Sequence, residues 1–385
     1  MLERPDHPHD AFSWMDVLRT SAAVLVAVSH VRDILWRDAL PSDPFVWKGF
    51  FLLTGFGHIG VVVFFVLSGF WITRSVMKRI DQPRFWSNYL IDRVSRLWIV
   101  LIPVLIIGGA LDWVGVTWWQ TANYTATSGM HSLSHPVADS LGLTEAIGSL
   151  LFLSKISVLP LGSNGPLWSL AYEFWYYLWF PALAFFAFRR KVSLPLAAVG
   201  LAFISGDLVF GFLSWLMGSA LHFILQRYEK NPRLPWERIL FIASFLIFLV
   251  LLFTARVVQK AWIDPMLAAS FAFFLLGMCR VNLRFPVLLQ PIATFGSGSS
   301  FSLYALHFPL AMAITAWLTA GVRQEPSLIL FGQTMGIMAF LLVAAFVFSR
   351  LTETNTDVLR QALKRMLIPV GRTSQPSTAA SADNV

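Results

Sequence analysis

Three side chains near the start of the chain stand out because a lipid bilayer disfavours them. Asp16, Arg19 and His30 lie within the otherwise apolar stretch FSWMDVLRTSAAVLVAVSHVRDILW. A charged group at bilayer depth costs roughly 2.5–3.5 kcal/mol on insertion scales, so such residues usually face a protein interior and carry function. Arg19 and His30 fall on one face of a helix, with a rise of about 16 Å between them. We therefore expect a phosphate-binding guanidinium and a proton-accepting imidazole to share one interior.

Two carboxylates flank this pair. Asp16 lies three residues before Arg19, a spacing that allows an ion pair on one helix face. Such a pair can also serve only to set the depth of the helix in the membrane. Asp33 follows His30 by about one turn, where a carboxylate can orient the imidazole and raise its basicity, as a general base requires. The alternative for His30 is an interfacial histidine that is hydrogen-bonded to a loop.

Later segments add further intramembrane candidates. Glu173 lies inside GPLWSLAYEFWYYLWFP, where a carboxylate is a candidate for function or a structural partner for a buried cation such as Arg19. Tyr304 and His307 in SSFSLYALHFPL are three residues apart and share a helix face. A histidine at the start of a helix beside a proline is equally compatible with a structural role.

A glycine-rich segment and a basic stretch complete the set. Ser68 lies in GHIGVVVFFVLSGFWITR, a pattern typical of close helix packing with hydrogen bonds between helices. Arg93 and Arg96 lie in RFWSNYLIDRVSRLWIVLIP. Basic residues at a membrane boundary mainly set topology, and they can also receive an anionic ligand.

The composition identifies the elements that must position these residues. The chain has 385 residues, of which 56% are apolar and 13% charged, about half the charged fraction of a soluble domain. Apolar windows near 20 residues recur along the chain, which predicts an all-α, polytopic integral membrane protein with about ten transmembrane helices in a single membrane domain. The expected spans are 14–36, 57–77, 93–112, 167–188, 194–209, 211–227, 237–255, 262–280, 300–320 and 328–349.

The charge distribution predicts the topology. The net charge of +8 resides mainly in short loops on the side of both termini, so the positive-inside rule places both termini in the cytoplasm. The charge is therefore no sign of nucleic-acid binding. We interpret the first span as a retained helix, since no cleavage site follows a short hydrophobic core. Cys279 is the only cysteine, which excludes an internal disulfide and a cysteine-based metal cluster, and we predict no metal site.

The span pattern divides the chain into a cytoplasmic leader (1–13), a transmembrane domain (14–350) and a cytoplasmic, largely disordered tail (351–385). The domain includes one long extracytoplasmic loop (113–166), whose apolar second half is expected to lie on the membrane or dip into it. Loops of this length are usually functional or disordered, and the apolar content favours function. Its tryptophans can stack on sugars, although an interfacial belt is the favoured interpretation; they are Trp113, Trp118 and Trp119.

Taken in order, these motifs resemble the acyltransferase-3 family, bacterial integral-membrane O-acyltransferases that modify cell-surface and secreted glycans. The resemblance runs from about residue 12 to 350, and Phe301 stands where the family usually has tyrosine. The matching positions are Asp16, Arg19, His30, Gly57 to Phe70, Arg93, Arg96, Pro103, Trp168, Ser169, Leu170, Glu173, Ser300, Ser302, Leu303, Tyr304, His307 and Pro309.

The resemblance implies a bacterial inner-membrane enzyme that uses cytoplasmic acyl-coenzyme A, most often acetyl, as donor substrate and binds no permanent cofactor. Arg19, Arg93 and Arg96 would hold the donor phosphates. His30 would deprotonate a carbohydrate hydroxyl, with Asp16 and Glu173 completing the candidate catalytic set. The remaining site candidates are Ser68, Tyr304, His307 and Asp33. A succinyl donor, an acyl-histidine intermediate and association with glycan-synthesis proteins stay open.

Two other classes of protein fit the span pattern. A transporter or flippase could use Asp207 and Glu173 as coupling residues, but the sequence shows no inverted repeat or paired broken helices. A non-enzymatic scaffold for a glycan-synthesis complex is the third possibility. Acylation of surface glycans distinguishes the enzyme from both.

Overall fold

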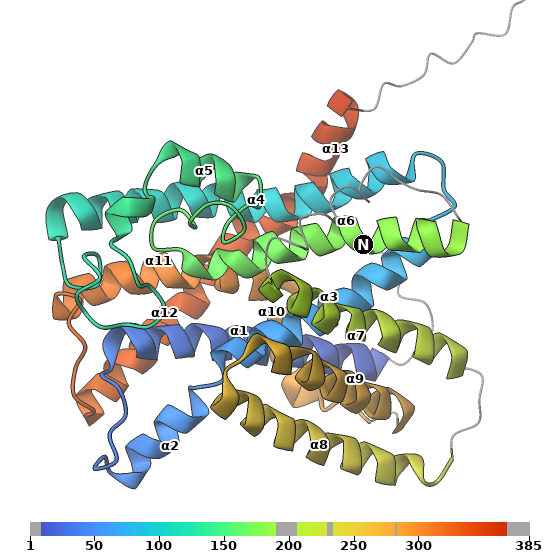
Figure 1. The fold of residues 1–385 in the computed structure, drawn as a ribbon, viewed down its shortest axis with the longest axis horizontal. Coiled ribbons are helices and arrows are strands. Elements are labelled where there is room, and N and C mark those ends of the chain that lie inside the picture. Colours follow the sequence, from blue (N-terminus) through green and yellow to red (C-terminus); the bar gives the residue numbers. More distant parts are fainter. Residues whose placement is uncertain (1–8, 190–205, 229–233, 282, 368–385) are drawn as a thin grey trace, which may run out of the picture.

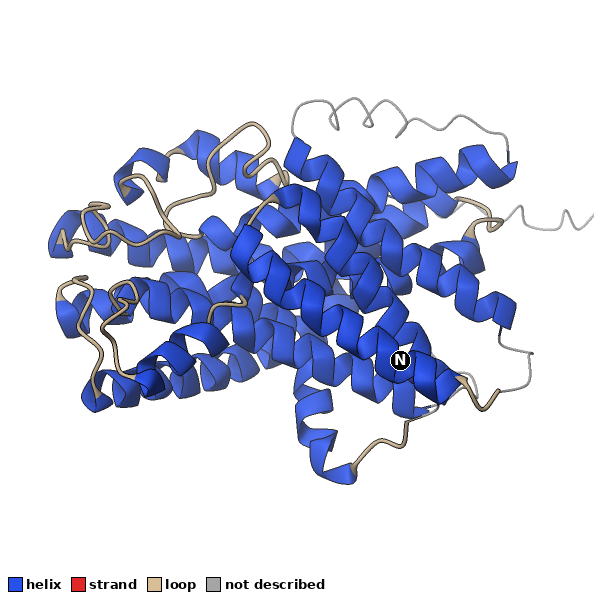
Figure 2. Ribbon diagram, turned by 60° about the horizontal axis from the view of Figure 1, so that its bottom comes forward, coloured by secondary structure: helices blue, strands red, loops and turns tan. Residues whose placement is uncertain are grey.

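The computed structural model describes residues 9–189, 206–228, 234–281 and 283–367. Within these ranges the structure consists of helices and loops, with no strand (Figure 2). The long helices are α1 (His9–Leu35), α3 (Gly57–Arg79), α4 (Phe85–Val114), α6 (Trp168–Arg189), α7 (Gly206–Tyr228), α8 (Glu237–Val258), α9 (Asp264–Val281), α11 (Ser300–Thr319) and α12 (Leu328–Leu351). The short ones are α2 (Phe45–Leu53), α5 (Leu143–Leu150), α10 (Gln290–Gly298) and α13 (Thr356–Leu367).

The helices confirm an all-α, multi-pass membrane protein. Among the described residues, 8 stretches are long and apolar enough to cross a membrane. Helix α6 is 22 residues long but carries many tryptophan and tyrosine side chains, and it is not one of the eight. The expected span 194–209 falls largely outside the described residues. Gly206 and Asp207, which belong to the expected span 194–209, form the first turn of α7.

Helix α1 runs through the middle of the bundle (Figure 1) and packs against α3, α10 and α11. Helix α3 in turn packs against α7, where the two backbones touch. A Cβ atom on Gly218 would lie 1.9 Å from the Val66 carbonyl oxygen, and one on Gly69 would lie 2.0 Å from the Trp215 carbonyl oxygen. Only glycine fits at such a crossing. Gly69 of α3 and Gly218 of α7 therefore set the position of α3, which lines the site described below.

The long segment between α4 and α6 folds onto the bundle. Helix α4 continues into a π-helical turn over Gly115–Trp119, so the tryptophans expected in the loop extend the helix instead. Trp98 Nε1 donates to the Leu150 carbonyl oxygen at 3.1 Å, and Trp175 Nε1 donates to the Phe152 carbonyl oxygen at 2.9 Å. These bonds tie the apolar half of the segment to α4 and α6, and deliver the chain to the buried start of α6.

The segment from residue 351, expected to be largely disordered, contains a 3-10 turn over Glu353–Asn355 and then α13. Asp92 of α4 forms ion pairs with three basic side chains: Arg79 at 2.5 Å, Arg360 at 3.3 Å and Lys364 at 3.6 Å. The last two belong to α13, so this helix is anchored to α4 by charge. Residues 368–385 lie outside the described part of the chain.

Candidate functional site

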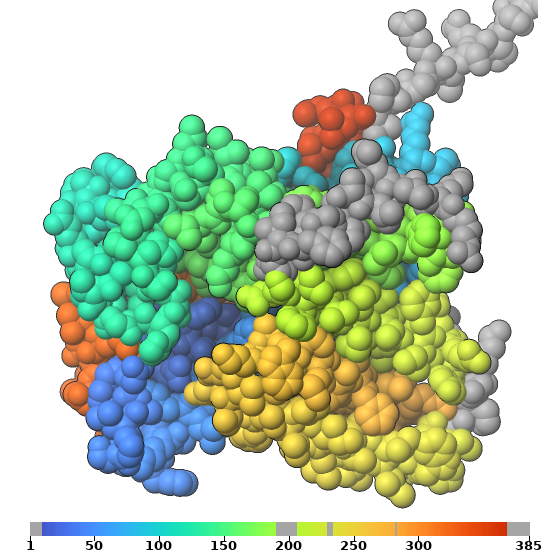
Figure 3. Space-filling model, in the orientation of Figure 1, coloured from blue at the N-terminus to red at the C-terminus, as the bar shows by residue number. Residues whose placement is uncertain are grey.

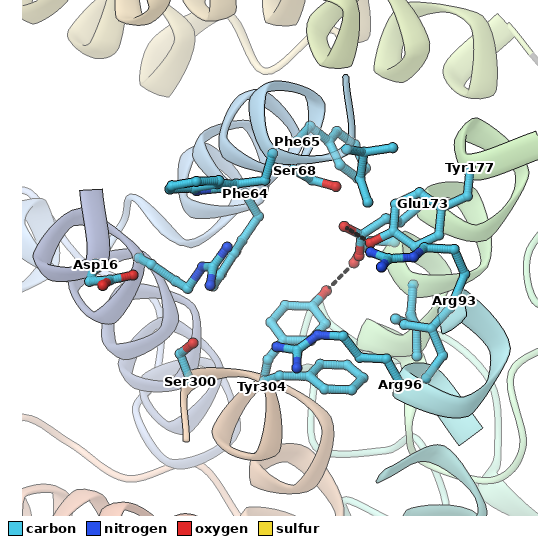
Figure 4. Close-up of a pocket in the computed structure, with 17 residues that line it drawn as sticks. Asp16, Phe64, Phe65, Ser68, Arg93, Arg96, Glu173, Tyr177, Ser300 and Tyr304 are labelled. Atoms are coloured by element: carbon cyan, nitrogen blue, oxygen red, sulfur yellow. Dashed lines mark hydrogen bonds between the residues drawn. The ribbon is translucent and has the colours of Figure 1, made fainter. Parts of the chain in front are cut away.

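A cavity of about 280 Å³, here called the arginine cavity, lies among α1, α3, α4, α6 and α11. Figure 4 shows Asp16 on one side of it and Arg93, Arg96 and Glu173 on the other. Seven of the ten sequence candidates line it, namely Asp16, Arg19, Ser68, Arg93, Arg96, Glu173 and Tyr304, whereas His30, His307 and Asp33 do not.

The arginine cavity suits a ligand with several negative charges. Arg19, Arg93 and Arg96 reach it from α1 and α4. Of the two carboxylates in its wall, Glu173 accepts a hydrogen bond from the Tyr177 hydroxyl at 2.7 Å. Guanidinium groups bind phosphate through parallel hydrogen bonds, so three of them around one cavity can hold a polyphosphate.

His30 lies at the other end of α1 and is hydrogen-bonded to His307 of α11. The distance from His30 Nδ1 to His307 Nε2 is 2.8 Å, and the two rings are nearly parallel, at 7°. On the far side of the second ring, His307 Nδ1 lies 2.7 Å from the Tyr304 carbonyl oxygen and 3.1 Å from the Leu303 carbonyl oxygen. The two sequence candidates therefore form one pair.

The partners of His307 assign the protons of both neutral rings. Carbonyl oxygens only accept hydrogen bonds, so His307 Nδ1 carries the proton and donates it. His307 Nε2 then has the lone pair, and accepts from the Nδ1–H of His30. His30 consequently keeps its own lone pair on Nε2, which is the atom able to take a proton from a substrate. The hydrogen bond to His307 therefore favours this tautomer of His30.

A second cavity of about 480 Å³, here called the histidine cavity, includes His30 and Asp33 in its wall. Asp33 accepts hydrogen bonds from the backbone N–H groups of His131 and Ser132 and from the Ser132 hydroxyl. It therefore anchors the segment between α4 and α6. The sequence favoured Asp33 as the residue that orients His30, whereas in the structure His30 is hydrogen-bonded to His307.

Arg19 and His30 line different cavities. The arginine and histidine cavities share no lining residue among the described ones, whereas the sequence predicted that both side chains open into one interior. Helix α11 links the two sites, because Tyr304 lines the arginine cavity one turn before His307. The Tyr304 hydroxyl bonds to the Ser169 hydroxyl at 2.5 Å and to the Pro166 carbonyl oxygen at 2.7 Å. Tyr304 thus lines the arginine cavity and accepts the hydrogen bond of His307 through its carbonyl oxygen.

Several residues of the histidine cavity escaped the sequence analysis, among them His58, Arg256 and Arg323. Each lies at the end of an apolar stretch, where a charged residue has the same pattern as a topology signal. Only the folded structure shows that they line the same cavity as His30. Among the residues that the structure describes, no group of three or more His, Cys, Asp and Glu side chains is arranged to hold a metal ion.

A family model described as an acyltransferase domain, the acyltransferase-3 family, matches residues 12–352, nearly the whole chain. No curated protein and no solved structure matches the chain. The matched range contains both cavities and the histidine pair.

Proposed function

The chain belongs to the acyltransferase-3 family and is a membrane acyltransferase, and from this premise we propose that it moves an acyl group from acyl-coenzyme A to a carbohydrate hydroxyl. The acyl group is most simply acetyl, and the carbohydrate belongs to the cell surface or is secreted. The hydrogen bond between His30 and His307 carries the proposal. It gives a membrane helix a proton acceptor of assigned tautomer beside a cavity, which acyl transfer to a hydroxyl requires.

The arginine cavity is the proposed donor site. The coenzyme carries its negative charge on phosphates, and Arg19, Arg93 and Arg96 supply three guanidinium groups. Asp16 and Glu173 in the same wall are proposed to hold these groups in place. The rise of about 16 Å along α1 from Arg19 to His30 is comparable to an extended pantetheine arm. The donor can therefore span from its phosphates to the histidine pair.

The arm must pass from the arginine cavity to the histidine cavity, which share no lining residue among the described ones, to bring the thioester to His30. Phe64 of α3 and Tyr304 of α11 both line the arginine cavity, and their rings meet edge-on with centroids 5.7 Å apart. We propose that these two side chains move apart when the donor binds. The proposed movement is a change of side-chain rotamers.

In the proposed reaction, His30 Nε2 accepts the proton of the acceptor hydroxyl while its oxygen attacks the thioester carbonyl carbon. The new C–O bond forms, the C–S bond breaks, and the coenzyme thiolate leaves with its electron pair. The proton on His30 then neutralises the thiolate, which restores the starting tautomer. His307 Nε2 accepts a hydrogen bond from His30 Nδ1 throughout. Transfer through an acyl-histidine uses the same atom of His30 and remains the alternative pathway.

The proposed location is the bacterial inner membrane with both termini in the cytoplasm. The N-terminal half of α1 then places the arginine cavity toward the cytoplasm, where acyl-coenzyme A is made. The C-terminal end of α1 places the histidine cavity toward the outside, where surface carbohydrate is found. The two substrates therefore approach the histidine pair from opposite sides.

Mass spectrometry of surface and secreted glycans tests the proposal. We expect a strain that lacks the gene to lose one acetyl or succinyl increment from one class of glycan. The wild-type gene should restore it, and a His30→Gln variant of equal abundance should not. An unchanged acylation pattern contradicts the proposal, and altered glycan export with unchanged acylation favours a transporter.

A further inference from the structure

The histidine cavity continues into a neighbouring cavity of about 620 Å³, here called the side cavity. The two share Gly55, His58, Arg256 and Gln259 in their walls. In Figure 3 the surface of α1, in dark blue, is visible in a recess between the segment after α4, the start of α9 and the region around α2. Basic residues outnumber acidic ones in the combined lining. The basic ones are Arg32, Arg37, Lys155, Arg256, Lys260 and Arg323, and the acidic ones are Asp33, Asp38, Asp207 and Asp264.

Most of the carboxylates in these walls already have partners. Asp33 is held by the backbone of the segment after α4, and Asp264 lies 2.9 Å from His58 Nε2. Asp38 bonds to Arg323 at 2.6 Å and to His131 at 3.0 Å, and the Arg323 guanidinium lowers the pKa of that carboxyl. None of these three acids forms an ion pair with Arg32 or Arg256 among the described residues.

Two guanidinium groups in the combined lining, those of Arg32 and Arg256, form no ion pair with a carboxylate among the described residues. Arg32 donates a single hydrogen bond of 3.3 Å, to the Phe51 carbonyl oxygen. Arg256 forms no hydrogen bond or ion pair within the described ranges, although its Nε is buried. A buried donor without a partner is costly and calls for an explanation.

The backbone makes room for Arg256. A Cβ atom at Gly55 would lie 2.3 Å from Arg256 Nε, so the guanidinium rests against a position that any side chain would fill. Arg256 of α8 thus contacts the short link between α2 and α3. This contact holds its guanidinium group where the histidine cavity meets the side cavity. The geometry therefore presents Arg256 to the cavity rather than to another protein group.

From these contacts we infer that the acceptor carries an anionic oxygen group, a carboxylate or a phosphate, which Arg32 and Arg256 bind. The inference rests on the proposed function. Arg32 follows His30 by two residues on α1, and both line the cavity that Arg256 also faces. An acceptor whose anionic group is held by the two arginines has its neighbouring hydroxyls beside His30. Planar guanidinium groups match both kinds of oxyanion.

The test uses full-length variants in a strain that lacks the gene, with Arg32→Gln and Arg256→Gln as the central changes. Gly55→Val is an independent variant, because it displaces Arg256 without altering its charge. Arg238→Gln is the matched control, since Arg238 lies exposed near the other end of α8. Melting temperature and the KM for acetyl-coenzyme A verify that each variant is folded and binds donor.

We expect the glycan that loses its acyl group on gene deletion to be anionic, and fragmentation distinguishes a carboxylated sugar from a phosphorylated one. Arg32→Gln and Arg256→Gln should each reduce its acylation rate about tenfold or more, as for a lost charged hydrogen bond, with the donor KM unchanged. Gly55→Val should resemble Arg256→Gln, and Arg238→Gln should resemble the wild type.

The outcomes separate the two hypotheses. A neutral acylated glycan overturns the inference and leaves the proposed function intact. Wild-type rates in both folded arginine variants overturn it as well, whichever anion the glycan carries. If the deletion changes no glycan, the proposed function itself fails and the inference falls with it.

Discussion

Replacing His307 with leucine isolates the contribution of the histidine pair to catalysis. The change removes the lone pair that accepts the Nδ1–H of His30 at 2.8 Å, while leucine fills a similar volume among buried residues of α11. His30 remains in place, but neither its tautomer nor its orientation is held. We therefore expect a slower chemical step with donor binding largely intact, since the arginine cavity is not touched.

The size of the effect follows from the hydrogen bond. When His30 takes up the substrate proton, its bond to His307 becomes charge-assisted, and such bonds contribute about 1.5–3 kcal/mol. With about 1.36 kcal/mol for each factor of ten, kcat should fall roughly 10- to 150-fold. His307→Gln keeps an acceptor oxygen near the position of Nε2 and should recover part of the loss. Removal of His30 itself should cost about 10²- to 10⁴-fold.

The assay follows radiolabelled acetyl from acetyl-coenzyme A into the glycan fraction of membranes that contain each variant at equal abundance. His222→Leu is the matched control, because His222 is a buried histidine of α7 and lies outside the lining of the three cavities described above. Initial rates over a range of donor concentrations separate kcat from the KM for the donor.

The double variant provides the sharpest refutation. If His307 acts only through His30, then His307→Leu adds little to the loss already caused by His30→Ala. Independent, multiplying losses contradict the positioning role. So does a folded His307→Leu variant with wild-type kcat, or one in which only the donor KM rises.

Three further predictions concern the donor site, the helix packing and the acid stability. Arg96→Ala should raise the KM for acetyl-coenzyme A about tenfold or more with a smaller change in kcat, as measured by donor titration, because it removes one proposed phosphate ligand. Gly218→Val should lower the melting temperature of the purified protein strongly, since its Cβ would lie 1.9 Å from the Val66 carbonyl oxygen and overpacking costs about 1–3 kcal/mol or more; an unchanged melting temperature contradicts the packing. The hydrogen bonds from Arg37 lower the pKa of Asp43 to about 2, below its unfolded value of about 3.9. The ionised Asp43 therefore stabilises the fold above about pH 4, and this stabilisation is lost as the pH falls toward 2. Asp43→Asn should flatten that part of a plot of melting temperature against pH, and an unaltered slope contradicts the assignment.

Hydropathy and small residues predicted the helices well because a bilayer imposes length and apolarity on every crossing segment. The expected span 57–77 became α3 (Gly57–Arg79), and 328–349 became α12 (Leu328–Leu351). Polar and aromatic segments at the boundaries were harder to predict. The short helix α5 and the charge-anchored α13 depend on contacts with α4, and no local periodicity encodes such contacts.

The candidate site was likewise predicted in part from the sequence. Spacing along one helix predicted that Arg19 and His30 lie on the inward side of α1, and both line cavities. Spacing carried no information about the separation of the two cavities, because side chains from several packed helices line each of them. It also favoured Asp33 as the partner of His30, since a carboxylate one turn away is the nearest candidate in sequence.

The sequence by itself determined the membrane class, the family and the residue types available for chemistry, because these depend on composition and on spacing within single helices. Only the tertiary structure decided that His30 bonds to His307, which lies 277 positions away, and that Asp33 anchors a distant segment instead. It also placed Arg256 beside the cavity of His30. Pairings of this kind depend on how whole helices pack against each other, and packing between helices is a property of the folded chain.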